Sequence, residues 1–142
     1  RTEYSLLTQN TVKKEEIAGI LFDSYGIYEQ MKEGTQPRKI TVIVPPLNRH
    51  GGAIPFTTEM EDETDASLID QLKTTDVDDS MYVFESKDPT YEKGNYRLNF
   101  NGRVTVPSVK NFQLVPPTNI NNITCQFGKV GAEHFHLDYK AH

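Results

Sequence analysis

Two histidines and an aspartate alternate near the end of the chain, in the run 134–138 (HFHLD). If this run is a strand, His134, His136 and Asp138 point to one face, because successive side chains alternate across a strand. Two imidazoles and a carboxylate are a common ligand set for zinc or iron. Any half-buried strand produces the same period of two, and the other two histidines complete no known metal motif. We therefore favour an ordinary polar strand face, and expect no metal and no other cofactor.

Other residue types that perform chemistry occur without the spacing that catalysis needs. The acidic runs Glu59–Asp65 and Asp76–Asp79 lack the glycine and closing glutamate of a calcium loop. The chain has no Gly-x-Ser-x-Gly elbow and no glycine-rich phosphate loop. Cys125 is the single cysteine and lies in an apolar run, which indicates a small buried hydrophobe and fits a reducing compartment. The sequence therefore predicts a protein that is not an enzyme.

The basic residues are scattered, and the formal net charge of the chain is −5. Binders of nucleic acid or of membrane surfaces usually carry a positive surplus, so any anion must meet a local cluster of bases. Lys13 and Lys14 are neighbours at the entrance to an apolar run. They can face one anion together only if the backbone there is not a regular strand.

The elements that must position these residues are predicted to be mainly strands. The chain has 142 residues, 36% hydrophobic and 25% charged, which suits one folded domain. Short apolar-alternating runs broken by Gly, Pro, Asn and Asp indicate an antiparallel β protein. The predicted strands are Tyr4–Leu7, Ile17–Phe22, Lys39–Val44, Met81–Glu85, Tyr96–Asn101, Phe112–Val115, Ile123–Phe127 and Phe135–Tyr139.

One short helix is predicted at Asp65–Lys73, where Leu68, Ile69 and Leu72 share a face and Asp65 is the expected N-cap. The segment Lys87–Gly94 is expected to be a loop. The side chains expected to be largely buried, from the alternation of apolar residues, are Tyr96, Leu98, Phe100, Val104, Phe112, Leu114, Phe127 and Phe135.

Residues 96–115 read YRLNFNGRVTVPSVKNFQLV, and this string resembles the signature of the tubby-like protein family. Two further stretches are similar to family segments: residues 37–45 (PRKITVIVP), and residues 126–139 with their QFGKV, Phe135 and Asp138-Tyr139. The match is looser around Glu16–Phe22, and little is similar between Gly51 and Gly94.

The resemblance implies a mainly β fold, an antiparallel tubby-type β-barrel whose strands surround a hydrophobic helix. We expect residues 1–142 to be the C-terminal part of a single tubby domain. The resemblance places the first strands of the barrel before Arg1. It places the central helix after Asp138-Tyr139.

The resemblance also implies a function: binding phosphatidylinositol 4,5-bisphosphate in the plasma membrane as a membrane-tethered adaptor for protein cargo or signalling. The expected location is cytoplasmic and peripheral at the plasma membrane, with the nucleus or cilium as further locations. The family site uses an early Lys-x-Arg pair, expected before Arg1, and a later Arg that corresponds to Lys14. Lys keeps the charge but lacks the planar fork of Arg. The phosphoinositide-binding residues are therefore predicted to be Lys14, with Lys13 as a lesser contributor.

Three alternatives belong to other classes of protein. The first is a DNA-binding transcription regulator released from the membrane, although the negative charge makes DNA an unlikely partner for this part of the chain. The second is a degenerate protein-interaction module that has kept the barrel and lost the lipid. The third is a metal enzyme built on His134, His136 and Asp138, which the resemblance weakens because the family has non-ligand residues at both histidine positions.

Overall fold

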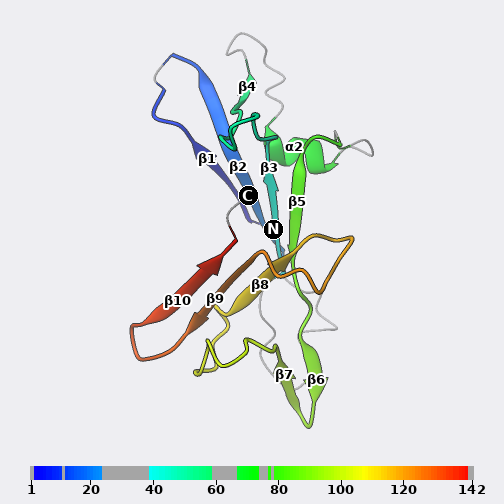
Figure 1. The fold of residues 1–142 in the computed structure, drawn as a ribbon, viewed down its shortest axis with the longest axis vertical. Helices are drawn as coiled ribbons and strands as arrows, with labels where there is room; N and C mark the ends of the chain where they lie inside the picture. Colours follow the sequence, from blue (N-terminus) through cyan, green and yellow to red (C-terminus); the bar gives the residue numbers. More distant parts are fainter. Residues whose placement is uncertain are drawn as a thin grey trace. The chain divides into compact units, whose positions relative to one another are not determined.

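The chain forms two compact units, which Figure 1 shows in a computed structural model of the protein. The first unit comprises Arg1–Phe22 and Thr41–Phe84, and the second comprises Asp23–Ile40 and Glu85–His142. The structure describes residues 2–10, 12–23, 39–58, 67–73, 77 and 79–140. Among these residues, no helix is both long and apolar enough to cross a lipid bilayer.

The first unit is built on a sheet in the order β1-β2-β3-β5, with β4 paired to β2. Its strands are β1 (Thr2–Leu7), β2 (Lys14–Asp23), β3 (Lys39–Val44), β4 (Phe56–Thr58) and β5 (Tyr82–Ser86). Strands β1 and β2 are antiparallel, and their register shifts at Leu6/Leu7, so that Ile17 is an extra residue on β2. The residues on either side of this β-bulge, Glu16 and Ala18, are buried, whereas Ile17 is exposed.

Helix α2 (Leu68–Lys73) closes the core of the first unit. Leu68 and Ile43 are fully buried, and each such side chain contributes about 1.5–3 kcal/mol of burial free energy. A Cβ atom at Gly19 would lie 2.9 Å from Ile69 Cγ1 and 3.0 Å from Ile43 Cγ2. The missing side chain at Gly19 therefore lets α2 approach the sheet.

The second unit is built on the end of β5 followed by β8, β9 and β10, and it also contains a separate hairpin of β6 and β7. The paired strands β5–β8, β8–β9 and β9–β10 are antiparallel. The elements are β6 (Thr90–Glu92), β7 (Asn95–Arg97), β8 (Phe112–Val115), β9 (Cys125–Lys129) and β10 (Phe135–Tyr139).

One face of β8–β9–β10 is aromatic. The rings of Phe112 and Phe127 are 5.7 Å apart, and those of Phe127 and Phe135 are 5.0 Å apart and almost parallel. On β10, Leu137 and Tyr139 remain 57% and 75% exposed. This aromatic face is thus only partly shielded from solvent by the described residues.

The antiparallel, mainly β character and the short helix predicted from the sequence are confirmed. Three strands, Lys39–Val44, Phe112–Val115 and Phe135–Tyr139, have the predicted bounds. The strand predicted at Tyr96–Asn101 ends at Arg97, because Asn101 and Gly102 adopt positive φ angles of 52° and 77° and turn the chain. The predicted loop Lys87–Gly94 contains β6, and β4 was not predicted.

The prediction that eight side chains are largely buried agrees with the structure, because none of them is exposed. Leu114 is buried, and the other seven keep an intermediate exposure. The half-buried members are Tyr96, Leu98, Phe100, Val104, Phe112, Phe127 and Phe135.

Candidate functional site

The two predicted phosphoinositide ligands lie where the β1–β2 turn enters β2. Lys14 is the first residue of β2 and is the partner of Thr58 on β4, and its side chain is half-buried. Lys13 precedes the strand and is exposed, and its backbone N–H donates to Asn10 Oδ1. The two lysines can face one anion together only where the backbone is not a regular strand. Lys13 meets this condition because it belongs to the turn, whereas Lys14 belongs to β2.

Glu15 holds this turn in shape. Its carboxylate accepts hydrogen bonds from Thr8 Oγ1 at 2.8 Å and from Asn10 Nδ2 at 3.0 Å. Asn10 Oδ1 in turn accepts from the backbone N–H of Val12 at 2.9 Å. Glu15 therefore uses neutral donors across the turn, and it does not pair with either neighbouring lysine.

Glu16 fastens the same strand to helix α2. Its side chain is 1% exposed, and Oε2 accepts a 2.6 Å hydrogen bond from Leu68 N–H. Glu16 Oε1 has no hydrogen-bond partner among the residues that the structure describes. A buried carboxylate that keeps a charge-assisted bond to a backbone N–H fixes the backbone next to Lys14. Nothing in the sequence run Lys13–Glu16 distinguished this buried acid from Glu15, which is only half-buried.

The cations of the first unit differ in their pairing. Lys73 Nζ lies 3.0 Å from Asp70 Oδ1 and 3.5 Å from Glu3 Oε1. Within the described part of the chain, neither the Lys13 nor the Lys14 ammonium group makes an ion pair. The carboxylates of the neighbouring Glu15 and Glu16 lower the local positive potential around both groups.

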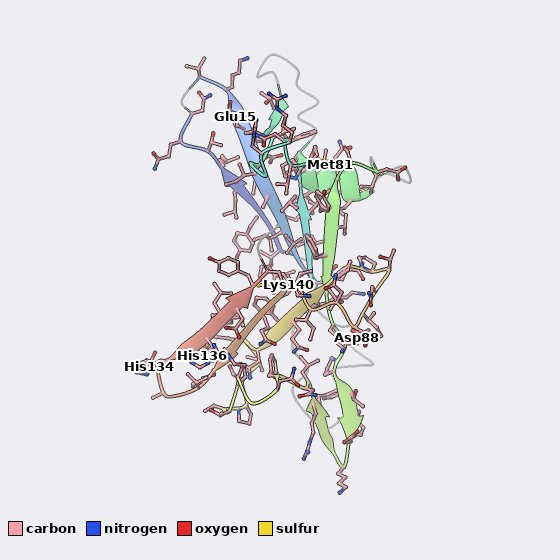
Figure 2. All side chains as sticks on the ribbon, viewed as in Figure 1. Glu15, Met81, Asp88, His134, His136 and Lys140 are labelled. Carbon is pink, nitrogen blue, oxygen red and sulfur yellow. The ribbon has the colours of Figure 1, made fainter. Side chains whose placement is uncertain are left out.

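Two of the alternating residues, His136 and Asp138, are engaged in side-chain hydrogen bonds with the segment around Arg103. His134 lies before β10, in the β9–β10 turn (Figure 2). His136 Nδ1 lies 2.8 Å from the backbone oxygen of Arg103. Asp138 accepts from Arg103 Nη2 at 2.8 Å and from Arg103 Nε at 3.1 Å. Among the described residues, no group of His, Cys, Asp and Glu is arranged to hold a metal ion.

The Arg103–Asp138 pair is one end of a polar row that we call the signature network, formed by Asn99, Arg103, Gln113, Gln126 and Asp138. Gln126 Nε2 donates to Asp138 Oδ2 at 2.9 Å. Gln113 Nε2 donates to Gln126 Oε1 at 3.1 Å and to the Asn99 backbone oxygen at 2.9 Å. The network thus joins β8, β9 and β10 to the segment 98–111.

The contacts in the signature network shift the pKa of Asp138 and of Arg103. The hydrogen bonds from Arg103 and then from Gln126 hold the pKa of the Asp138 carboxyl well below its ordinary value. Arg103 is stabilised as a cation in return, and its pKa is raised by the same pair. The two groups therefore neutralise each other and leave no free charge for a ligand.

Gly128 and Val104 explain a further part of the signature. A Cβ atom at Gly128 would overlap both Val104 methyl groups and would lie 2.9 Å from Val104 Cβ. The segment around Val104 is also held to β9 by two backbone N–H groups, those of Thr105 and Val106, which donate to the Lys129 oxygen. Gly128 therefore permits close contact between the segment around Val104 and β9.

Cys125 lies beside the network in a shallow depression of about 250 Å³ that Gln126 and Asp138 also line. Burial, and then the charge of Asp138, raise the pKa of the Cys125 thiol. A raised pKa reduces the thiolate fraction, and the thiolate is the reactive form. The interpretation of Cys125 as a largely structural residue is consistent with this environment.

Comparison with known proteins places the chain in a family. A profile of the Tub family matches residues 3–141. The chain is 34% identical to human tubby-related protein 2 over 136 residues, which is 94% of the chain. It is 38% identical to mouse tubby-related protein 1 over 107 residues, or 73% of the chain. It is 30% identical to tubby protein homolog 1 of Caenorhabditis elegans over 141 residues, or 94% of the chain.

The chain is therefore a member of the Tub family, and its antiparallel β fold is the class expected for part of a tubby-type barrel. It spans only 24% of the human relative, 19% of the mouse relative and 31% of the nematode relative. The expectation that residues 1–142 form the C-terminal part of a single tubby domain stays a prediction.

Proposed function

We propose that this protein is a phosphoinositide-binding adaptor without catalytic activity, and that Lys14 contacts a phosphate of the headgroup. The observation that carries the proposal is the Lys14 ammonium group, which has no ion pair in the described part of the chain and stands on a backbone fixed by Glu16. Membership of the Tub family supports it. Lys13, exposed in the adjoining turn, is a lesser and longer-range contributor.

The proposed ligand is phosphatidylinositol 4,5-bisphosphate at the cytoplasmic face of the plasma membrane, where the protein tethers cargo or signalling components. Traffic to a cilium, or release to the nucleus, are further roles of the same kind. DNA is a weaker candidate, because a chain of net charge −5 repels a polyanion except at local bases.

The test is a calorimetric titration of the soluble bisphosphorylated inositol headgroup into the full-length protein and its Lys14→Ala variant. A charge-assisted contact contributes about 1.5–3 kcal/mol, so the variant should bind roughly tenfold to a hundredfold more weakly. Lys14→Arg should hold or raise the affinity, because the guanidinium supplies two parallel donors to phosphate oxygens.

Lys140→Ala is the matched control, because it also removes one positive charge. Lys140 follows β10 in the second unit, whereas the proposed site lies on β2 in the first unit. The Lys140 Nζ donates to Asn122 Oδ1. Its headgroup affinity should equal that of the wild type. Equal affinities of wild type and Lys14→Ala would remove Lys14 from the site. No headgroup binding by the wild type would favour the degenerate protein-interaction module.

A further inference from the structure

The β6–β7 hairpin forms a two-stranded sheet of its own in the second unit, and it extends beyond β8, β9 and β10 (Figure 1). Its residues pair as Thr90↔Arg97, Tyr91↔Tyr96 and Glu92↔Asn95. The start of this segment is marked by Asp88 in Figure 2. Each strand has only three residues, so the hairpin presents a small tip and no groove.

The tip consists of Lys93 and Gly94, whose φ angles are 49° and 83°. Positive φ at both central residues defines a two-residue turn in which Asn-Gly is the favoured pair. Lysine is uncommon in this backbone conformation, and a residue held there against its preference is a reason to look for a role. The Lys93 ammonium group is exposed and makes no ion pair within the described residues.

Tyr91 and Tyr96 form an aromatic pair on one face of the hairpin. Their ring centroids are 4.9 Å apart, and Tyr91 is 49% exposed. Thr90, Glu92 and Arg97 occupy positions on the opposite face, because neighbouring residues alternate across a strand. Tyrosine prefers the boundary between water and lipid, where the ring meets apolar groups and the hydroxyl stays hydrated.

Local charge is compatible with an anionic surface. Residues 87–97 contain three bases and two acids, a net charge of +1, in a chain whose net charge is −5. Stable protein partners usually cover roughly 800 Å² on each side, which two three-residue strands do not offer. A bilayer interface needs only an aromatic anchor and a nearby cation.

We propose that the β6–β7 hairpin is a shallow membrane-contact element that places Tyr91 in the interface and Lys93 against anionic headgroups of a lipid bilayer. This inference rests on the proposed membrane function, and it assigns a second contact that needs no phosphoinositide. Tyr91 provides the apolar anchor, and Lys93 at the turn provides the charge.

The first experiment uses Tyr91→Trp in the full-length protein, because the 142 residues contain no tryptophan. Vesicles of phosphatidylcholine and phosphatidylserine, without phosphoinositide, should shift the emission of the introduced indole to shorter wavelength. Lipids with brominated acyl chains should quench it. The wild type is the blank for any other tryptophan, and Tyr4→Trp on β1, 54% exposed, is the control that should neither shift nor be quenched. An unshifted and unquenched indole at position 91 would overturn the proposal.

The second experiment separates binding from folding. Lys93→Asn places the favoured residue at the turn, so the free energy of unfolding should hold or rise. Its affinity for the same vesicles should fall about fivefold, which corresponds to about 1 kcal/mol for one base near an anionic surface. Lys93→Arg should bind as the wild type does. Vesicle affinity of Lys93→Asn equal to that of the wild type would overturn the role of Lys93.

Soluble headgroup titration distinguishes this inference from the proposed function. Tyr91→Ala should lower vesicle binding several-fold and leave headgroup affinity unchanged. If the headgroup does not bind but the indole at position 91 is quenched, the hairpin inference stands and the Lys14 proposal fails. If the headgroup binds and the indole stays unquenched, the hairpin inference fails alone.

Discussion

At the scale of single residues, polar side chains of the signature segments form the signature network. Gly128, in the same segments, allows Val104 to pack closely against β9. Arg103 and Asp138 are 35 residues apart and meet in a two-pronged pair. Gln113 and Gln126 continue the row across β8 and β9. A network of this kind holds a loop to a sheet, because each lost partner leaves a polar group with an uncompensated desolvation cost. One atom of the network, Gln113 Oε1, is buried without a hydrogen-bond partner among the described residues.

Gly128→Ala tests the close contact. The new methyl group would overlap Val104, so the free energy of unfolding should fall by about 1–3 kcal/mol. Gly131→Ala is the control, because a Cβ there would lie 3.5 Å from its nearest atom, His134 Nδ1. Urea denaturation gives both values, and addition of Val104→Ala to Gly128→Ala should recover part of the loss. Equal stability of the Gly128 and Gly131 variants would contradict the packing argument.

Acid should weaken the fold through the aspartates whose pKa is lowered. Asp70 has a pKa of about 2, lowered first by the Ser67 backbone N–H and then by Lys73, and the Asp138 carboxyl is lowered by Arg103 and Gln126. Each contributes stability above the ordinary value of 3.8, and this stability is lost as the pH falls through the folded-state pKa. The free energy of unfolding should therefore fall below about pH 4.

Asp138→Asn should be less stable than the wild type at neutral pH, and its stability should depend less on pH below pH 4, because Asn does not titrate. The exposed Asp88→Asn provides the control for removal of a charge. Parallel pH profiles of Asp138→Asn and the wild type in urea titrations would show that the carboxylate contributes nothing.

At the scale of elements, the stability of α2 depends on the capping of its N-terminus. The helix has six residues, too few to be stable in isolation. The Ser67 hydroxyl accepts from Asp70 N–H at 3.2 Å, and Asp70 Oδ2 accepts from Ser67 N–H at 2.9 Å. The N-cap is therefore Ser67, and the prediction of Asp65 falls outside the described residues.

Ser67→Ala should cost about 1 kcal/mol, the usual value of an N-cap side chain. Hydrogen exchange should speed up at the amides of α2, because the helix loses its reciprocal cap. Ser5→Ala, exposed on β1, should be neutral. Unchanged exchange in α2 would mean that Glu16 and the buried Leu68 hold the helix without the cap.

At the scale of the whole molecule, the proposed lipid site works against the net charge of −5. Attraction between lysines and phosphates acts over short distances, and salt screens exposed charges over about 8–10 Å at ordinary ionic strength. Headgroup affinity should therefore fall as salt is added. A rise in affinity with salt, measured by the same titration, would mean that repulsion from the acidic chain outweighs the local lysines.

The sequence by itself determined the strands whose alternation is strong, such as Phe112–Val115 and Phe135–Tyr139, and it determined the family through residues 96–115. Both properties are local, because side-chain alternation follows from the pleat of a single strand. The mainly antiparallel fold follows from many such runs separated by turn residues.

Only the tertiary structure decided which side chains meet. Arg103 pairs with Asp138, Gly128 contacts Val104, and Glu16 bonds to Leu68 N–H. Each contact joins segments that lie far apart in the chain, and the period of one strand does not encode its partner or its register. The same reason explains why Leu114 is the one fully buried member of the predicted core, while the other seven side chains keep an intermediate exposure. Alternation gives the face of a strand, whereas burial depends on what covers that face.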